Sequence, residues 1–326
     1  MAVYTELAPH EIAAVLAAYG LPAPDRVVPE PKGYVNTNHH VWTGGRRYFL
    51  RVAEASGDAD VAFEAEVHRF LHAARFPAPR LLSTADGAPA ARVRGKSALL
   101  FAYAPGEELG AGEIAPEHCR RVGEALARLH ELSAGFVGER ANPYGWARVA
   151  GWIASLRDAP GGAEVRDALP LLEDELARAG SLPGAPRGLV HGDLFVDNVL
   201  WMGGRPSAVL DWEMSCVEAF AYDLGVALSA WCWEEGAGGG FVRERARALA
   251  AGYRGGRRVE AETADALLPF ARFAALRFAA SRLVALRAPD PGRDRAPRKD
   301  WRPYRDRLAA LGEMGEERFR ELLGGG

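Results

Sequence analysis

Three side chains in the middle of the sequence, Asp193, Asn198 and Asp211, have the types and spacing that phosphoryl transfer requires. The reaction needs one carboxylate beside the attacking hydroxyl and oxygen ligands for Mg²⁺, all within one small volume. A loop over residues 191–198 and a β-hairpin turning at residues 201–205 would bring Asn198 and Asp211 to neighbouring strand ends, with Asp193 facing them. We therefore predict Asp193 as the catalytic base, and Asn198 and Asp211 as the metal ligands.

A second interpretation makes these ordinary loop residues. Asp193 and Asp197 would then sit in turns, and Asn198 would be a helix cap. This interpretation leaves the apolar run over residues 208–210 and its terminal Asp211 unexplained, so the catalytic interpretation accounts for more of the pattern.

The arrangement of His191, Asp193 and Asn198, followed by an apolar strand ending in Asp211, resembles the catalytic loop and metal-binding Asp of protein kinases. Protein kinases carry Arg where this chain has Gly192. With Gly at that position, the pattern is similar to the kinase-like phosphotransferases of small molecules, which include aminoglycoside, choline, methylthioribose and homoserine kinases.

This resemblance implies an α/β (α+β) fold with the two lobes of a protein kinase. Residues 1–103 are expected to form an N-lobe, an antiparallel sheet plus a helix that covers the nucleotide. Residues 104–326 are expected to form a larger, mostly helical C-lobe that carries the catalytic loop, the metal site and the acceptor site. The implied cofactors are ATP and Mg²⁺, and the implied partner is a small molecule with a hydroxyl group.

Composition places the chain among ordinary globular proteins. It has 326 residues, a formal net charge of −3 and 48% hydrophobic residues, so no basic field indicates nucleic acid as a partner. The sequence contains no long uncharged apolar run, so no membrane span is predicted. Three cysteines without metal-ligand spacing, Cys119, Cys216 and Cys232, predict buried thiols and a cytoplasmic protein. Nothing in the sequence indicates an oligomeric state.

Residues 26–52 have the pattern of three strands, and the turn between the first two corresponds to the nucleotide-covering loop of the related fold. Gly33 and Asn36 in this turn would offer N–H and side-chain donors to phosphate oxygens. A plain hairpin turn without a ligand is the alternative at this site.

Arg51 occupies the strand position where the related kinases usually carry the Lys that contacts the α- and β-phosphates. Arg keeps the positive charge and adds a forked set of donors. The alternative is a solvated strand residue. The resemblance implies that Glu64, on an amphipathic helix over residues 61–75, pairs with Arg51, and that Glu66 is solvated.

Strands are also expected over residues 81–84, 91–93 and 97–103, the last leading into the hinge between the lobes. The resemblance implies that backbone groups near Phe101 and Tyr103 hydrogen-bond an adenine edge while apolar side chains enclose its faces.

The remaining sequence is mostly helical in pattern. We expect His130 to be a hydrogen-bonded core residue. Asp223 is expected either to support the catalytic segment or to be a simple carboxylate at a helix N-terminus. A helix over residues 270–286 carries several arginines, most of them expected on a solvated face. Further helices are expected from residue 116 and over residues 145–157, 164–179 and 301–323.

Three stretches, residues 193–200, 221–232 and 275–283, resemble bacterial homoserine kinases of the phosphotransferase type most closely. Arg277 and Arg282 are candidates for binding an acceptor carboxylate. Asp197 is a candidate for binding an acceptor amine, although a solvated loop residue explains it equally well. The chain departs from that group at residues 211–213, where it has Asp-Trp-Glu instead of Asp-Phe-Tyr, and at residues 229–232, where it has Ser-Ala-Trp-Cys instead of Asn-Asp-Trp-Cys.

These observations favour a small-molecule kinase with L-homoserine as the leading acceptor. An aminoglycoside kinase, or another amino-alcohol or sugar kinase, is the first alternative. A nucleotide-binding pseudokinase module is the alternative of a different class.

Overall fold

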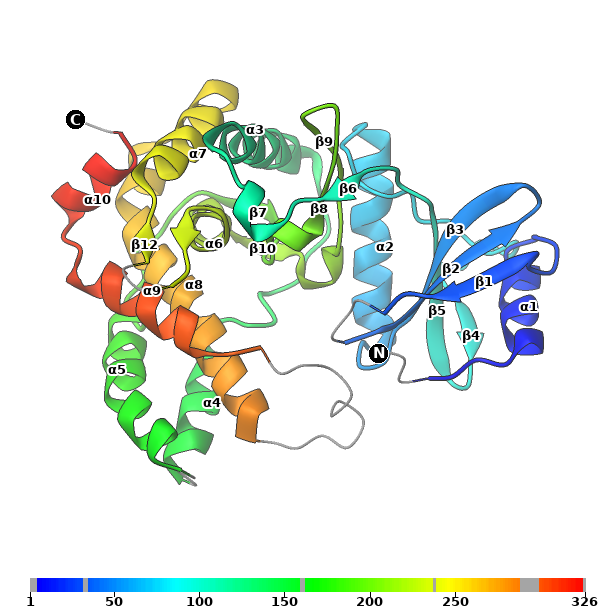
Figure 1. Ribbon diagram of the computed structural model, residues 1–326, viewed down its shortest axis with the longest axis horizontal. Helices are drawn as coiled ribbons and strands as arrows, with labels where there is room; N and C mark the ends of the chain where they lie inside the picture. Colours follow the sequence, from blue (N-terminus) through cyan, green and yellow to red (C-terminus); the bar gives the residue numbers. More distant parts are fainter. Residues whose placement is uncertain (1–4, 32–34, 159–161, 237–238, 288–298, 325–326) are drawn as a thin grey trace. The chain divides into compact units, whose positions relative to one another are not determined.

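The computed structural model describes residues 5–31, 35–158, 162–236, 239–287 and 299–324. These residues form two compact units (Figure 1). The N-terminal unit runs to Pro105, and the C-terminal unit contains the described residues from Gly106 onward.

The N-terminal unit is a five-stranded antiparallel sheet in the order β1-β2-β3-β5-β4, with a helix packed on each face (Figure 1). Its elements are α1 (Pro9–Ala18), β1 (Arg26–Pro29), β2 (Thr37–Thr43), β3 (Arg46–Val52), α2 (Asp58–Ala73), β4 (Ala91–Val93) and β5 (Lys96–Ala102).

The alternation of β3 decides which way Arg51 points. Leu50 packs in the cluster that includes Leu16 of α1, whereas Phe49 packs with Val61 of α2 on the opposite face. Since side chains alternate between the two faces of a strand, Arg51 shares the face of Phe49 and is directed at α2.

The C-terminal unit is mainly helical, with three small sheets in the orders β6-β8-β9, β10-β7 and β11-β12 (Figure 1). Its helices are α3 (Pro116–Leu132), α4 (Trp146–Asp158), α5 (Ala163–Ala179), α6 (Phe220–Trp231), α7 (Arg243–Gly256), α8 (Ala261–Arg287), α9 (Arg302–Glu313) and α10 (Glu316–Leu322). Short 3-10 helices cover Ala111–Glu113, Ser133–Gly135, Val196–Asn198 and Trp212–Met214. Its strands are β6 (Glu107–Glu108), β7 (Arg187–Val190), β8 (Val199–Met202), β9 (Arg205–Val209), β10 (Cys216–Ala219), β11 (Trp233–Glu234) and β12 (Gly240–Phe241).

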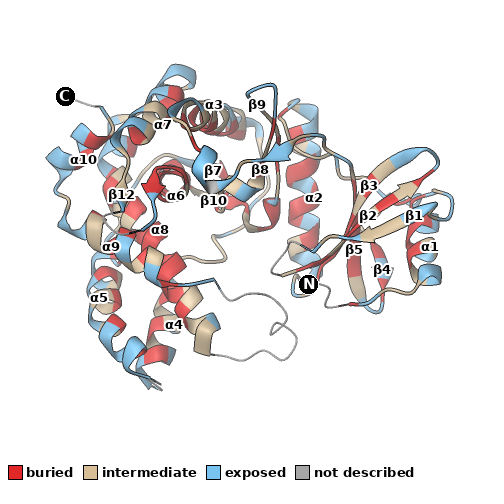
Figure 2. Cartoon of the chain, in the orientation of Figure 1, coloured by how far each residue is buried: buried red, intermediate tan, exposed pale blue. Residues whose placement is uncertain are grey.

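Helix α6 is the centre of this unit and is buried along almost its whole length (Figure 2). It packs closely against α8. A Cβ atom at Gly225 would lie 2.6 Å from the Cα atom of Ala271, so only glycine permits this approach of the two helices. The close contact fixes α8, and with it Arg277, against the helix that carries Asp223.

Several predicted elements need correction. Residues 81–84 form one isolated bridge, Leu81 to Phe101, instead of a strand, because the chain turns at residues 85–87 and Thr84 donates its hydroxyl to the Ala88 carbonyl at 3.0 Å. The helix expected over residues 301–323 is two helices, α9 and α10. Its break is at Met314 and Gly315, whose backbones are extended.

Within the described ranges, no helix has both the length and the apolar character needed to cross a membrane. The three cysteines are buried free thiols, as predicted.

Candidate active site

The loop after β7 contains a residue that must be glycine. Gly192 has a φ of +77°, and a Cβ atom there would lie 2.9 Å from the carbonyl oxygen of Met214. The positive φ and the close backbone approach both exclude a larger side chain. This explains why the sequence has Gly where protein kinases have Arg.

Asp223 of α6 holds this loop by its backbone. Its carboxylate accepts hydrogen bonds from the N–H groups of His191, at 2.9 Å, and of Gly192, at 2.8 Å. A third donor is His130 Nε2, at 3.2 Å, while His130 Nδ1 accepts from the Tyr253 hydroxyl at 2.8 Å. Of the two roles predicted for Asp223, these contacts favour support of the catalytic loop. His130 is a hydrogen-bonded core residue, as expected from the sequence.

The charges of this buried cluster follow from its contacts. Burial raises the pKa of Asp223, but the hydrogen bond and charge of His130 outweigh it, and the pKa lies below its ordinary value. Burial lowers the pKa of His130 more than Asp223 raises it. The cluster is therefore an ionised Asp223 with a neutral imidazole that donates from Nε2.

Four further hydrogen bonds join the loop to its neighbours. His191 Nε2 donates to the Leu210 carbonyl at 2.8 Å, and the Leu210 N–H donates to the Asn198 carbonyl at 2.8 Å. The Asn198 side-chain amide donates to the Asp193 carbonyl at 2.8 Å, and Trp231 Nε1 of α6 donates to the Leu194 carbonyl at 3.0 Å. Because the Asn198 amide nitrogen is turned toward Asp193, its side-chain oxygen is left to accept or to bind a cation.

Asp211 follows Leu210 directly, so it adjoins Asn198 through the Leu210 hydrogen bond. Its backbone is in the left-handed region, with φ 58° and ψ 68°, and its side chain belongs to an exposed residue. This conformation costs a non-glycine residue about 1–3 kcal/mol, and it occurs often at functional sites. The structure thus brings together the three residues that the spacing selected.

The donor set fits one particular kind of metal site. In the described part of the chain, no group of three or more His, Cys, Asp or Glu side chains is arranged to hold a metal ion. Asn198 and Asp211 offer one amide and one carboxylate oxygen. Mg²⁺ takes such hard oxygen donors when phosphate oxygens and waters complete its octahedral shell. The residues therefore fit Mg²⁺ held jointly with a nucleotide.

Arg277 of α8 forms an ion pair with the predicted base. Its Nη1 lies 3.2 Å from Asp193 Oδ1, and its guanidinium is held between the rings of Tyr144, at 4.1 Å, and Phe278, at 3.9 Å. Burial lowers the pKa of Arg277, but the nearby Tyr222 and Asp193 outweigh burial. The pKa of Arg277 is therefore above its ordinary value, and the group is charged. Most arginines of this helix are expected on a solvated face, with Arg277 and Arg282 singled out as acceptor candidates; Arg277 is indeed buried, because α8 is covered on most sides.

The other acceptor candidates have different surroundings. Arg282 Nη1 donates to the Asp300 carbonyl at 3.0 Å, and its guanidinium lies over the Tyr304 ring at 4.4 Å. Asp197 is exposed on its loop. Tyr304 was not selected from the sequence, since a single Tyr in a helix rich in arginine carries no distinguishing pattern.

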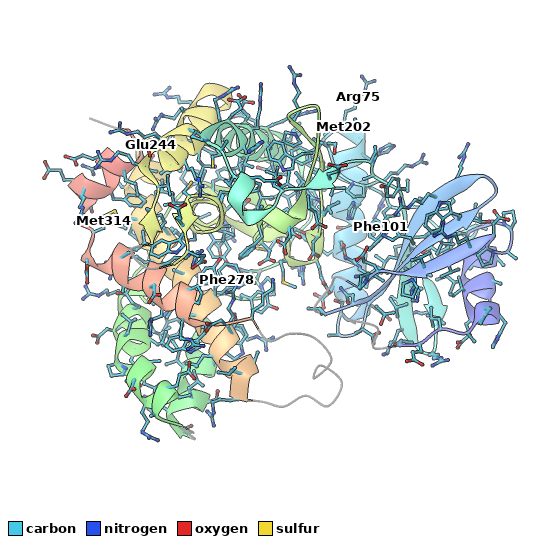
Figure 3. All side chains as sticks on the ribbon, viewed as in Figure 1. Arg75, Phe101, Met202, Glu244, Phe278 and Met314 are labelled. Atoms are coloured by element: carbon cyan, nitrogen blue, oxygen red, sulfur yellow. The ribbon has the colours of Figure 1, made fainter. Side chains whose placement is uncertain are left out.

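In the N-terminal unit, Arg51 Nη2 donates to Glu64 Oε2, and the side chains are 9% and 2% exposed. Burial raises the pKa of Glu64, but Arg51 and His68 lower it to about 2. Arg51 also lies 5.2 Å from the ring of Phe101, which Figure 3 labels. The predicted pair is present, a solvated Arg51 is excluded, and Glu66 is exposed as expected.

The remaining nucleotide candidates have these positions. Asn36 is buried and its side-chain oxygen accepts from the Glu54 N–H at 3.2 Å. Gly33 lies outside the described residues. Phe101 is buried in the sheet, whereas Tyr103 is 38% exposed and its N–H donates to the Arg47 carbonyl at 3.3 Å.

Sequence comparisons find relatives that are phosphotransferases. The model of the phosphotransferase enzyme family matches residues 26–262. The homoserine kinase of Sinorhizobium fredii is 35% identical over 290 residues, covering 87% of this chain and 86% of that protein. The homoserine kinase of a Methylobacterium species is 33% identical over 319 residues, covering 95% of each chain.

Comparison with solved structures shows the fold. An amicoumacin kinase in complex with AMP-PNP and Ca²⁺ has a TM-score of 0.69 at 15% identity, covering 91% of this chain and 92% of that one. A choline/ethanolamine kinase family protein from Mesorhizobium loti has a TM-score of 0.65 at 21% identity, covering 96% of each chain. The predicted two-lobed, kinase-like α+β fold is confirmed.

Proposed function

Since the chain belongs to the phosphotransferase enzyme family, we propose that it is a kinase that transfers the γ-phosphoryl group of ATP to the hydroxyl of a small acceptor. L-homoserine is the best candidate for this acceptor. The observation that carries the proposal is Asp193, whose loop is fixed by Asp223 and whose backbone carbonyl accepts the hydrogen bond that orients the Asn198 side chain.

Asp193 orients the acceptor hydroxyl and accepts its proton as the phosphoryl group is transferred. Asn198 and Asp211 would hold Mg²⁺, which when bound would supply charge compensation on the phosphate chain. Arg51, which Glu64 holds in place, is the proposed contact for the phosphates. Because the transition state of phosphoryl transfer is loose, positioning and charge supply most of the catalysis.

Nucleotide binding is assigned to the N-terminal unit and the residues that follow it. Gly33 and Asn36 are the proposed phosphate-loop residues, and the backbone near Phe101 and Tyr103 is the proposed adenine contact. The N–H groups of Ala102 and Tyr103 already donate to the carbonyls of Arg80 and Arg47. The adenine edge would therefore use the other polar groups of this stretch.

Homoserine is supported by relatives of that name at 33% and 35% identity over most of the chain. The cations of α8, Arg277 and Arg282, are the candidates for binding its carboxylate, and Asp197 is the candidate for binding its amine. The chain keeps Ser229 and Ala230 where homoserine kinases of this type tend to carry Asn and Asp. Ser229 is fully buried, so its own contacts are with the protein interior.

Two alternatives have less support. Aminoglycosides are polycations, and a site with Arg277 beside its base suits them poorly. A pseudokinase would not need the left-handed Asp211 or an intact Asp193 and Asn198. We place the reaction in the cytoplasm, where ATP is supplied and three free thiols stay reduced.

The test is Mg²⁺-dependent ADP release from ATP by the purified protein, with homoserine, other hydroxy-amino acids, amino alcohols, sugars and aminoglycosides as acceptors. Homoserine is expected to stimulate release selectively, and chelation of Mg²⁺ is expected to abolish it. Selective stimulation by another acceptor would replace the substrate and keep the kinase. ATP binding without turnover on any acceptor would favour the pseudokinase.

A further inference from the structure

Tyr304, near the start of α9, has a buried hydroxyl that needs a partner. The residue is 2% exposed, and its hydroxyl makes no hydrogen bond to any residue that the structure describes. Burying an unpaired phenol costs free energy that a Phe of the same shape would avoid. A hydroxyl kept at such a position points to a ligand that supplies the missing partner.

The groups around the ring indicate what that ligand is. The guanidinium of Arg282 lies 4.4 Å from the ring centroid, and that of Arg307 lies 4.7 Å from it. Each of the three guanidinium nitrogens of Arg307 already donates, to two backbone carbonyls and to Glu235. Arg282 makes one hydrogen bond within the described ranges, to the Asp300 carbonyl. A phenol donor whose ring lies under a guanidinium with unused N–H groups suits an anion, above all a carboxylate.

The position of Tyr304 connects it to the reacting end of the site. Phe278, labelled in Figure 3, packs on the Tyr304 ring with centroids 4.8 Å apart, and it also covers the guanidinium of Arg277 at 3.9 Å. Arg277 in turn contacts Asp193. Phe195, two residues after Asp193, lies 6.3 Å from the Tyr304 ring. The unpaired hydroxyl is therefore one aromatic side chain away from the proposed base.

We propose that the Tyr304 hydroxyl and the Arg282 guanidinium together bind the carboxylate of the acceptor, and that Arg277 serves Asp193 instead. This inference rests on the proposed function and names the residues that select an amino-acid acceptor over an amino alcohol. Burial raises the pKa of Tyr304 more than Arg282 and Arg307 lower it. The hydroxyl accordingly keeps its proton at neutral pH and donates.

The experiment compares two acceptors on two proteins. Homoserine is compared with the amino alcohol obtained by removing its carboxylate, which keeps the hydroxyl and the amine. Tyr304→Phe is expected to lower kcat/KM for homoserine by on the order of 10- to 100-fold, mainly through KM, and for the amino alcohol by less than about 3-fold. The KM for ATP is expected to stay unchanged.

Two further variants keep the test decisive. Arg282→Gln is expected to show the same selective loss of kcat/KM for homoserine. This second variant tests the carboxylate contact even if Tyr304→Phe folds poorly. Tyr19→Phe removes a hydroxyl that donates to the Ala98 carbonyl at 2.7 Å in the N-terminal unit. It is expected to lower the melting temperature and leave acceptor kinetics unchanged, whereas Tyr304→Phe is expected to melt at the same temperature or higher.

The outcomes separate this inference from the function beneath it. A wild-type protein that turns over neither acceptor overturns the proposed kinase function. A wild-type protein that turns over both without preferring homoserine overturns the carboxylate contact and homoserine as the acceptor, and leaves the kinase assignment standing. A wild-type protein with that preference, combined with Tyr304→Phe and Arg282→Gln variants that lose equally on both acceptors or on neither, overturns the carboxylate contact and leaves the kinase assignment standing.

Discussion

Each unit contains a buried arginine paired with a carboxylate, and the two pairs differ in which partner reaches solvent. In the N-terminal unit, Arg51 and Glu64 have side chains that are 9% and 2% exposed. In the C-terminal unit, Arg277 is 6% exposed whereas Asp193 is 23% exposed. The Arg51–Glu64 pair is shielded from solvent on both sides, whereas in the Arg277–Asp193 pair the carboxylate is accessible to solvent.

The difference in exposure indicates which member of each ion pair orients the other. Glu64 receives the guanidinium of Arg51 and has no exposed oxygen to offer, so it serves to orient a cation. Arg277 is fixed between Tyr144 and Phe278 and touches only one oxygen of Asp193. Because a buried ion pair adds little net stability by itself, we read both pairs as orienting devices.

The largest effect should come from Asp193→Asn. The amide has nearly the same shape but is a poor proton acceptor, so turnover should fall by on the order of 10²-fold or more. ATP binding, measured by calorimetry in the presence of Mg²⁺, should stay close to wild type because the nucleotide ligands are unchanged. Normal turnover in this variant would remove Asp193 from the role of base.

The next effect should come from Glu64→Gln, and it should depend on pH. The pKa of Glu64 is about 2, below its ordinary 4.5. The ion pair therefore stabilises the fold fully above pH 4.5, and this stability is lost as pH falls toward 2. At pH 7 the variant should lose on the order of 3 kcal/mol of unfolding free energy.

Urea unfolding at several pH values measures this effect. The difference between the variant and wild type should shrink by roughly 1.4 kcal/mol per pH unit below about 4.5. Glu66→Gln, on the exposed side of the same helix, is the matched control and should show no such difference. If the loss of unfolding free energy in Glu64→Gln did not vary with pH, the Arg51–Glu64 ion pair would not be the source of that loss.

The sequence was informative where spacing alone determines the chemistry. The interval from Asp193 to Asn198 and the apolar strand ending at Asp211 identified residues that the fold brings together. Both are local features, because one loop and one hairpin connect them. The Gly192 position has one local cause, its positive φ, and one that is not local, the close approach of the Met214 carbonyl.

The sequence was less informative where packing between distant elements decides. The pattern of α8 singles out Arg277 and Arg282 as acceptor candidates, but only the packing of α8 against α6 shows that Arg277 is buried against Asp193. Tyr304 gave no signal at all, because its meaning depends on which neighbours satisfy its hydroxyl. The break at Gly315 is not apparent in the sequence because the pattern is helical on both sides of it.

The smallest effect, and the sharpest for the comparison, should come from Arg277. Arg277→Met removes a hydrogen bond to a charged group and should lower kcat by roughly 10-fold, with Arg277→Lys recovering part of the loss. If Arg277 orients Asp193, the KM for the acceptor should hardly change. Arg272→Met is the matched control, since Arg272 is on the same helix but pairs with Glu175, 2.8 Å away, and should leave kcat unchanged. A rise in acceptor KM with normal kcat would instead return Arg277 to the carboxylate-binding role expected from the sequence, and the two ion pairs would no longer be orienting devices of the same kind.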